Sequence, residues 1–169
     1  MDLDFFELAA EPDAFDTPLR NVRIRLDGTA ACLDLIPSVM VDRPSGRTDF
    51  PRETAADRVI ADMAKHSGGL IVEADRLMRV WFSPVAAIVA QEEFVDLHAT
   101  LQSNYDRAPR LKGGKGIYPF LILPNSKWKQ RLPDYQGGDA PSLRHFQIFS
   151  METHVDVLGH LEKIEWLPN

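Results

Sequence analysis

The hydrophobic and polar positions alternate most regularly early in the chain. Residues 22–27 alternate apolar and polar side chains without a fault, which predicts a half-buried strand. The dipeptide Asp27-Gly28 follows and is favoured in tight hairpin turns. We therefore expect a return strand at 31–36, which Pro37 should end or bend.

Short apolar runs elsewhere predict further strands. They lie at residues 70–74, 77–82, 117–123, 144–150 and 163–167. Within 117–123, Pro119 lacks a backbone donor, which favours an edge position in a sheet. Within 144–150, Phe146 and Ile148 share one face, and His145 lies on the other.

Two longer segments have the pattern of helices. Residues 56–64 place apolar side chains at helical spacing, after Thr54 as a capping residue. Ser83-Pro84 is typical of a helix start and predicts a helix from 84 to about 104. Shorter helical segments are expected at residues 2–10, at Trp128 after a cap at Asn125 or Ser126, and at 151–158.

These elements predict an α+β fold. Paired strands with short turns favour a mainly antiparallel sheet of six to seven strands with two principal helices packed on it. The strict alternation of strand and helix that marks a parallel sheet is absent. We expect a single domain over residues 1–169, because no linker is long enough to separate two domains.

Charge is unevenly distributed along the chain, which carries a formal net charge of −6. Residues 1–16 hold six acids and no base, whereas residues 105–131 hold seven bases and one acid. Charge of one sign collected on one face speeds encounter with a partner of the opposite sign. Segregation of these two segments in space would give the molecule a strongly anionic face.

The acidic segment also carries aromatic side chains, which can anchor a protein interface. An ordinary amphipathic helix packed on its own domain is the alternative for this segment, and a flexible solvated loop is the alternative for residues 112–116. The candidate binding residues are Asp2, Asp4, Phe5, Phe6, Glu7, Lys112 and Lys115.

Catalytic signatures are absent from the sequence. None of the phosphate-loop, nucleophile-elbow, zinc-protease or dinucleotide-binding motifs occurs. His145 is the one candidate catalytic residue, provided that it lies in a cleft with a polar partner. The histidine spacings match no standard zinc site, so neither a metal nor a cofactor is expected. Cys32 is interpreted as a small buried hydrophobic residue.

Composition also bounds the partners and the compartment. An acidic domain disfavours nucleic acid and anionic membranes. No apolar run approaches the roughly 20 residues that span a bilayer. One cysteine and an acidic start, where a signal peptide would be basic, favour a cytoplasmic location.

Together these features predict a non-catalytic binding protein that recognises, and in one version inhibits, another macromolecule through an acidic surface. The partner is expected to be a protein, with a basic surface as one possibility. In size, acidity and lack of motifs the chain resembles small acidic inhibitor and immunity proteins. The alternative is a small enzyme or a binder of an anionic small molecule, using His145 and the basic residues of 107–131.

Overall fold

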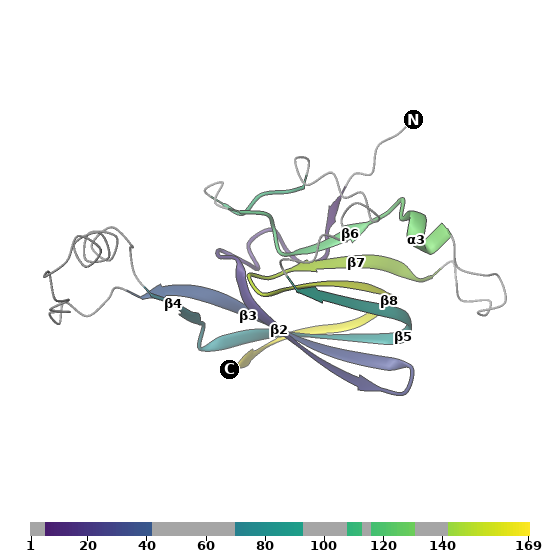
Figure 1. Ribbon diagram of the computed structural model, residues 1–169, viewed down its shortest axis with the longest axis horizontal. Helices are drawn as coiled ribbons and strands as arrows, with labels where there is room; N and C mark the ends of the chain where they lie inside the picture. Colours follow the sequence, from purple (N-terminus) through teal and green to yellow (C-terminus); the bar gives the residue numbers. More distant parts are fainter. Residues whose placement is uncertain (1–5, 42–69, 93–107, 113–115, 131–141) are drawn as a thin grey trace, which may run out of the picture. The chain divides into compact units, whose positions relative to one another are not determined.

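The computed structural model describes residues 6–41, 70–92, 108–112, 116–130 and 142–169 (Figure 1). The chain divides into two compact units. The first unit contains residues 1–38 and 73–169, and the second contains 39–72. The prediction of one domain over the whole chain stays a prediction.

The described residues are nearly all β-strand. They are 67% strand and 4% helix, with no helix of seven or more residues, so the predicted α+β fold with two principal helices is wrong. The strands are β1 (Glu7–Leu8), β2 (Leu19–Asp27), β3 (Ala30–Val41), β4 (Leu70–Glu73), β5 (Arg76–Glu92), β6 (Phe120–Leu123), β7 (Arg144–Phe149) and β8 (Thr153–Pro168). The single helix among the described residues is α3 (Lys127–Gln130).

The strands form one antiparallel sheet in the order β1-β6-β7-β8-β5-β3-β2, with β4 pairing β3. Two long strands, β5 and β8, run through its middle and pair along most of their length. The first part of β5 also pairs with β3, and the first part of β8 also pairs with β7. Register shifts between Trp81 and Ala87 interrupt the β5–β8 ladder. Such bulges bend a strand, so β5 and β8 run through two half-sheets. The first half-sheet contains β2, β3, the first part of β5 and the last part of β8, and the second contains the other parts of β5 and β8 with β7, β6 and β1.

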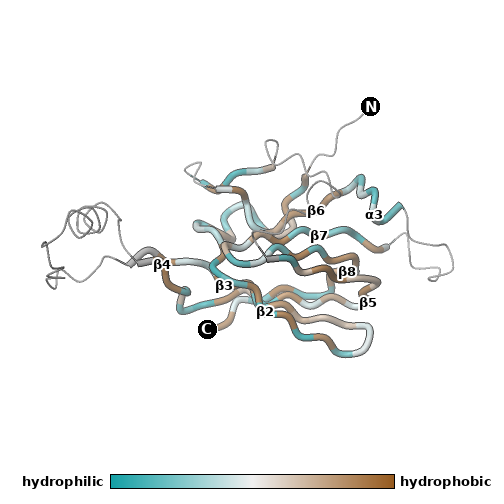
Figure 2. Tube along the Cα trace, viewed as in Figure 1, coloured by the Kyte–Doolittle hydropathy of each residue, from teal (hydrophilic) through white to brown (hydrophobic). Residues whose placement is uncertain are grey.

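The main core lies inside this bent sheet. Phe82 from β5 and Phe146 from β7 meet there, with ring centroids 4.9 Å apart, and neither side chain is exposed. Figure 2 shows hydrophobic residues along β6, β7 and β8. β6 is buried at all four residues, because it pairs with β1 on one side and β7 on the other. The sequence predicted an edge position for the strand that contains Pro119. This prediction is wrong, because β6, which follows Pro119, lies between β1 and β7.

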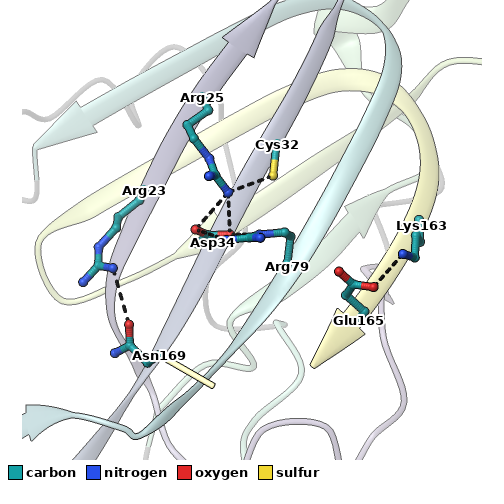
Figure 3. A network of polar contacts seen from close by, with 8 residues as sticks. All are labelled: Arg23, Arg25, Cys32, Asp34, Arg79, Lys163, Glu165 and Asn169. Atoms are coloured by element: carbon teal, nitrogen blue, oxygen red, sulfur yellow. Dashed lines mark hydrogen bonds and ion pairs between the residues drawn. The ribbon is translucent and has the colours of Figure 1, made fainter. Parts of the chain in front are cut away.

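The other face of the first half-sheet carries charged side chains in register. Asp34 of β3 lies between two arginines on the neighbouring strands (Figure 3). Arg79 donates to both carboxylate oxygens of Asp34, from Nε at 2.6 Å and Nη2 at 3.0 Å. Arg25 donates to the same carboxylate from Nη2, at 3.1 and 3.3 Å. This network ties β2, β3 and β5 together through their side chains.

Three helix predictions fail where strands form instead. Residues 83–92 belong to β5, 153–158 to β8 and 7–8 to β1. The run after Pro84 is apolar at nearly every position, and β8 pairs along it, so pairing overrides the helix-start signal. The rest of the predicted helix to residue 104, and the one at 56–64, lie outside the described residues.

Most of the strand predictions are confirmed. The hairpin of β2 and β3 turns at Gly28, whose φ of +57° suits glycine, but β3 continues through Pro37 to Val41. The strand at 144–150 matches β7, with Phe146 in the core cluster and His145 on the opposite face. The short helix with Trp128 is also confirmed, because Ser126 caps α3: the Lys129 amide donates to Ser126 Oγ at 3.0 Å.

Candidate functional site: an apolar groove with an acidic rim

Residues 7–11, in the described part of the acid-rich N-terminal segment, lie against residues 118–122, which precede and form β6. β1 pairs with β6, and the amide of Ala9 donates to the carbonyl oxygen of Phe120 at 3.0 Å. Further along, the Tyr118 hydroxyl donates to the carbonyl oxygen of Glu11 at 2.5 Å. These bonds hold residues 8–14 beside the sheet, where the amide of Ala14 closes a turn by donating to the carbonyl oxygen of Glu11 at 2.9 Å.

A groove of about 740 Å³ lies between residues 8–14, the beginning of β5 and the last residues of β8. That volume falls in the range of roughly 300–1,000 Å³ typical of ligand pockets. Its apolar lining residues are Leu8, Ala9, Ala10, Pro12, Ala14, Met78, Ile164 and Trp166, and its acidic ones are Glu11 and Asp13. The groove thus combines an apolar wall with carboxylates at one side.

Electrostatics at this side of the groove are negative. Burial raises the pKa of Tyr118 to about 12, and the charges of Glu11 and Asp13 add to the rise. Asp13 pairs with Lys112, but both side chains are about two-thirds exposed, so water screens the pair. Among the described residues Glu11 forms no ion pair.

Trp166 contributes the largest side chain of the groove lining, and 36% of it is exposed. Phe15 packs against its ring, with centroids 5.7 Å apart, and the Arg76 guanidinium lies 4.6 Å from its centroid. The ring lies at the border of core and groove. A partly exposed tryptophan in a fixed position is typical of residues that carry binding energy.

The predicted binding residues are dispersed. Asp2, Asp4, Phe5 and Lys115 lie outside the described residues. Phe6 packs against the core cluster, Glu7 Oε2 accepts from Arg144 Nη2 at 2.6 Å, and Lys112 pairs with Asp13. The acid-rich and base-rich segments thus partly neutralise each other through Asp13 and Lys112. Docking through a separate anionic face was expected from the segregation of these two segments, and this contact weakens that expectation.

His145 is almost fully buried and has polar partners on both ring nitrogens. Its Nδ1 lies 2.7 Å from Ser126 Oγ, and its Nε2 lies 2.8 Å from Asp156 Oδ1. Gln147 Nε2 donates to the same oxygen of Asp156 at 2.9 Å. The Trp128 ring packs edge-on against the imidazole, with centroids 5.2 Å apart.

This row of hydroxyl, imidazole and carboxylate has the residue types of a nucleophilic triad. A nucleophile must reach its substrate, however, and Ser126 is 1% exposed while its Oγ accepts the capping bond of α3. His145 does not line the groove. The cluster therefore acts to fix α3 on β7, and catalysis by His145 stays a prediction without support from the geometry.

Cys32 differs from its predicted surroundings. Its thiol is free and only partly buried, and Arg25 Nη2 lies 3.3 Å from Sγ. Arg25 lies on the other strand of the hairpin, and only the register brings it opposite Cys32.

No family model, curated protein or solved structure matches this chain. Among the described residues, no helix is long and apolar enough to cross a membrane. In the same part of the chain, no three His, Cys, Asp or Glu side chains are grouped closely enough to hold a metal ion.

Proposed function

We propose that the protein is a non-catalytic binding protein whose groove receives an apolar side chain from a basic segment of a partner protein. The groove of about 740 Å³ between residues 8–14 and the ends of β5 and β8 carries this proposal. Its apolar wall suits an aliphatic or aromatic side chain, and its carboxylates suit the lysines or arginines beside that side chain.

The groove is held in shape before a partner binds. β1 is hydrogen-bonded to β6, and Tyr118 fixes the backbone at Glu11. Behind the groove, Met78 is 1% exposed. A preorganised surface loses less conformational entropy on binding than a mobile one, which favours affinity.

The proposal keeps the expectation of a protein partner with a basic surface, and it moves the acidic contact from residues 2–7 to Glu11 and Asp13. It also keeps the expected cytoplasmic location, which the single free thiol of Cys32 supports.

Site-specific photocrosslinking in the native cell tests the proposal. A benzophenone side chain at Ala10, which lines the groove, should yield one major adduct with a partner protein. The same side chain at Ala86, an exposed alanine of β5 outside the groove lining, is the matched control. Glu11→Lys in the Ala10 reporter should reduce the adduct, because it reverses a rim charge.

Equal adducts at Ala10 and Ala86, or no adduct at either position, would contradict the proposed function. An adduct at Ala10 that Glu11→Lys leaves unchanged would contradict the role of the acidic rim.

A further inference from the structure

The outer margin of the first half-sheet is formed by β2, which pairs with β3 on one side and ends the strand order. Its beginning is occupied, because the carbonyl oxygen of Leu19 accepts from the amide of Met151 at 2.9 Å. Further along, residues 23 and 25–27 are exposed, and Leu26 is exposed by 69%. An exposed edge with an exposed leucine is the kind of surface that pairs with another strand.

The geometry of the turn determines which amide and carbonyl groups of β2 point outward, away from β3. Gly28 and Thr29 form a two-residue turn, and Asp27 pairs with Ala30 across it. Residues flanking such a turn exchange hydrogen bonds, and hydrogen-bonded positions alternate along an antiparallel pair. The backbone groups of Val22, Ile24 and Leu26 therefore point away from β3. The amide of Val22 instead donates to its neighbour's side chain, Asn21 Oδ1, at 2.7 Å.

The edge is complementary to itself. Pairing β2 antiparallel with a second copy about a twofold axis at Arg25 places Arg23 opposite Asp27 of the copy, twice. It also places Ile24 opposite Leu26, twice. Opposite charges and apolar pairs facing each other across strands are stabilising. The Arg25 side chains of the two copies face each other, but each is bonded to its own Asp34.

We propose that the β2 edge pairs with the β2 edge of a second copy of this chain, forming a twofold dimer through residues 22–27. The surface differs from the groove, so this inference does not depend on the proposed function. The paired segment is short, so the dimer should be weak and reversible.

Cysteine crosslinking tests the register in the full chain with Cys32→Ser, a change that removes the native thiol opposite Arg25. Arg25→Cys places the two sulfur atoms together at the axis, where paired Cα atoms lie about 4.5 Å apart. Thr29→Cys is the control, because it places an exposed thiol in the turn beyond residues 22–27, leaves every proposed pair intact and lies far from its copy.

Under mild oxidation, Arg25→Cys should form covalent dimers at least about tenfold faster than Thr29→Cys, since only the first pair meets disulfide geometry. Similar rates for the two variants would overturn the proposed register.

Sedimentation equilibrium tests the association without a new thiol. Asp27→Lys replaces two attractive pairs by two repulsive ones and should raise the dimer dissociation constant at least about tenfold. Glu162→Lys makes the same charge change at an exposed position of β8 and should leave the constant unchanged. A wild-type chain that stays monomeric into the millimolar range would overturn the proposal, as would equal effects of the two variants.

Discussion

Asp34→Ala is expected to lower the free energy of unfolding by about 2–3 kcal/mol at pH 7. The substitution removes the acceptor of two bonds from Arg79 and of the contacts from Arg25. Losing one partner of a buried ion pair costs roughly 3–5 kcal/mol. The expected value is smaller here because the Arg79 side chain is 26% exposed and water can solvate the unpaired guanidinium.

The effect should depend on pH. The hydrogen bond from Arg79 lowers the pKa of Asp34 against the opposing effect of burial, and the charges of Arg79 and Arg25 lower it further. A carboxyl whose folded pKa is depressed stabilises the fold fully above its unfolded pKa of about 3.9. That stabilisation is lost as the pH falls through the folded pKa. The wild type and Asp34→Ala should therefore differ most at neutral pH and converge below pH 3.9.

Urea unfolding followed by circular dichroism, repeated at stepwise lower pH, measures both effects. Arg25→Ala is the control, because this side chain is 57% exposed and its pair with Asp34 should contribute about 1 kcal/mol or less. An Asp34→Ala protein as stable as the wild type at pH 7 would refute the reasoning. So would a stability difference that stays constant down to pH 2.

Three further substitutions test other contacts. Gly159→Ala should destabilise by about 1–3 kcal/mol in urea unfolding, because a Cβ there would lie 3.1 Å from the Pro84 carbonyl oxygen. Tyr118→Phe should lower the free energy of unfolding by about 1 kcal/mol, because the hydrogen bond to Glu11 is lost. Since the pKa of Tyr118 is raised from 10.0 to about 12 in the folded protein, the wild type should lose stability as the pH rises from 10 to about 12, and Tyr118→Phe should abolish this loss. Ser126→Ala should lower the thermal midpoint by removing about 1–2 kcal/mol of capping, and an unchanged midpoint would contradict the role given to its hydroxyl.

Sequence periodicity predicted the strands whose two faces differ in polarity. Residues 22–27 alternate because Val22 is buried and Ile24 half-buried on one face of β2, whereas Arg23 and Arg25 are exposed on the other; Leu26 fits the alternation but is exposed. The turn at Gly28 has a local signature. The strand with Phe146 and His145 was predicted for the same reason, although both of its faces are buried.

The failed helix prediction after Pro84 has a physical cause. Residues 85–90 are apolar on both faces, so their pattern has neither the period of a helix nor that of a strand. Their state is set by β8, some 70 residues further along the chain. The groove was missed likewise, because residues 8–14 and Ile164 meet through tertiary structure alone. The acidic residues at its rim were noticed, but the sequence did not show that Lys112 would neutralise one of them.

The central claim is that an apolar groove with a negative rim prefers apolar cations. Tetraphenylphosphonium and tetraphenylborate have nearly the same shape and opposite charge, and the fluorescence of Trp166 in a Trp81→Phe, Trp128→Phe background reports on the groove. The account predicts that the cation binds several-fold more tightly than the anion and that Glu11→Gln weakens this preference, whereas Glu162→Gln does not. Equal affinity for the two ions, or tighter binding of the anion, would contradict it.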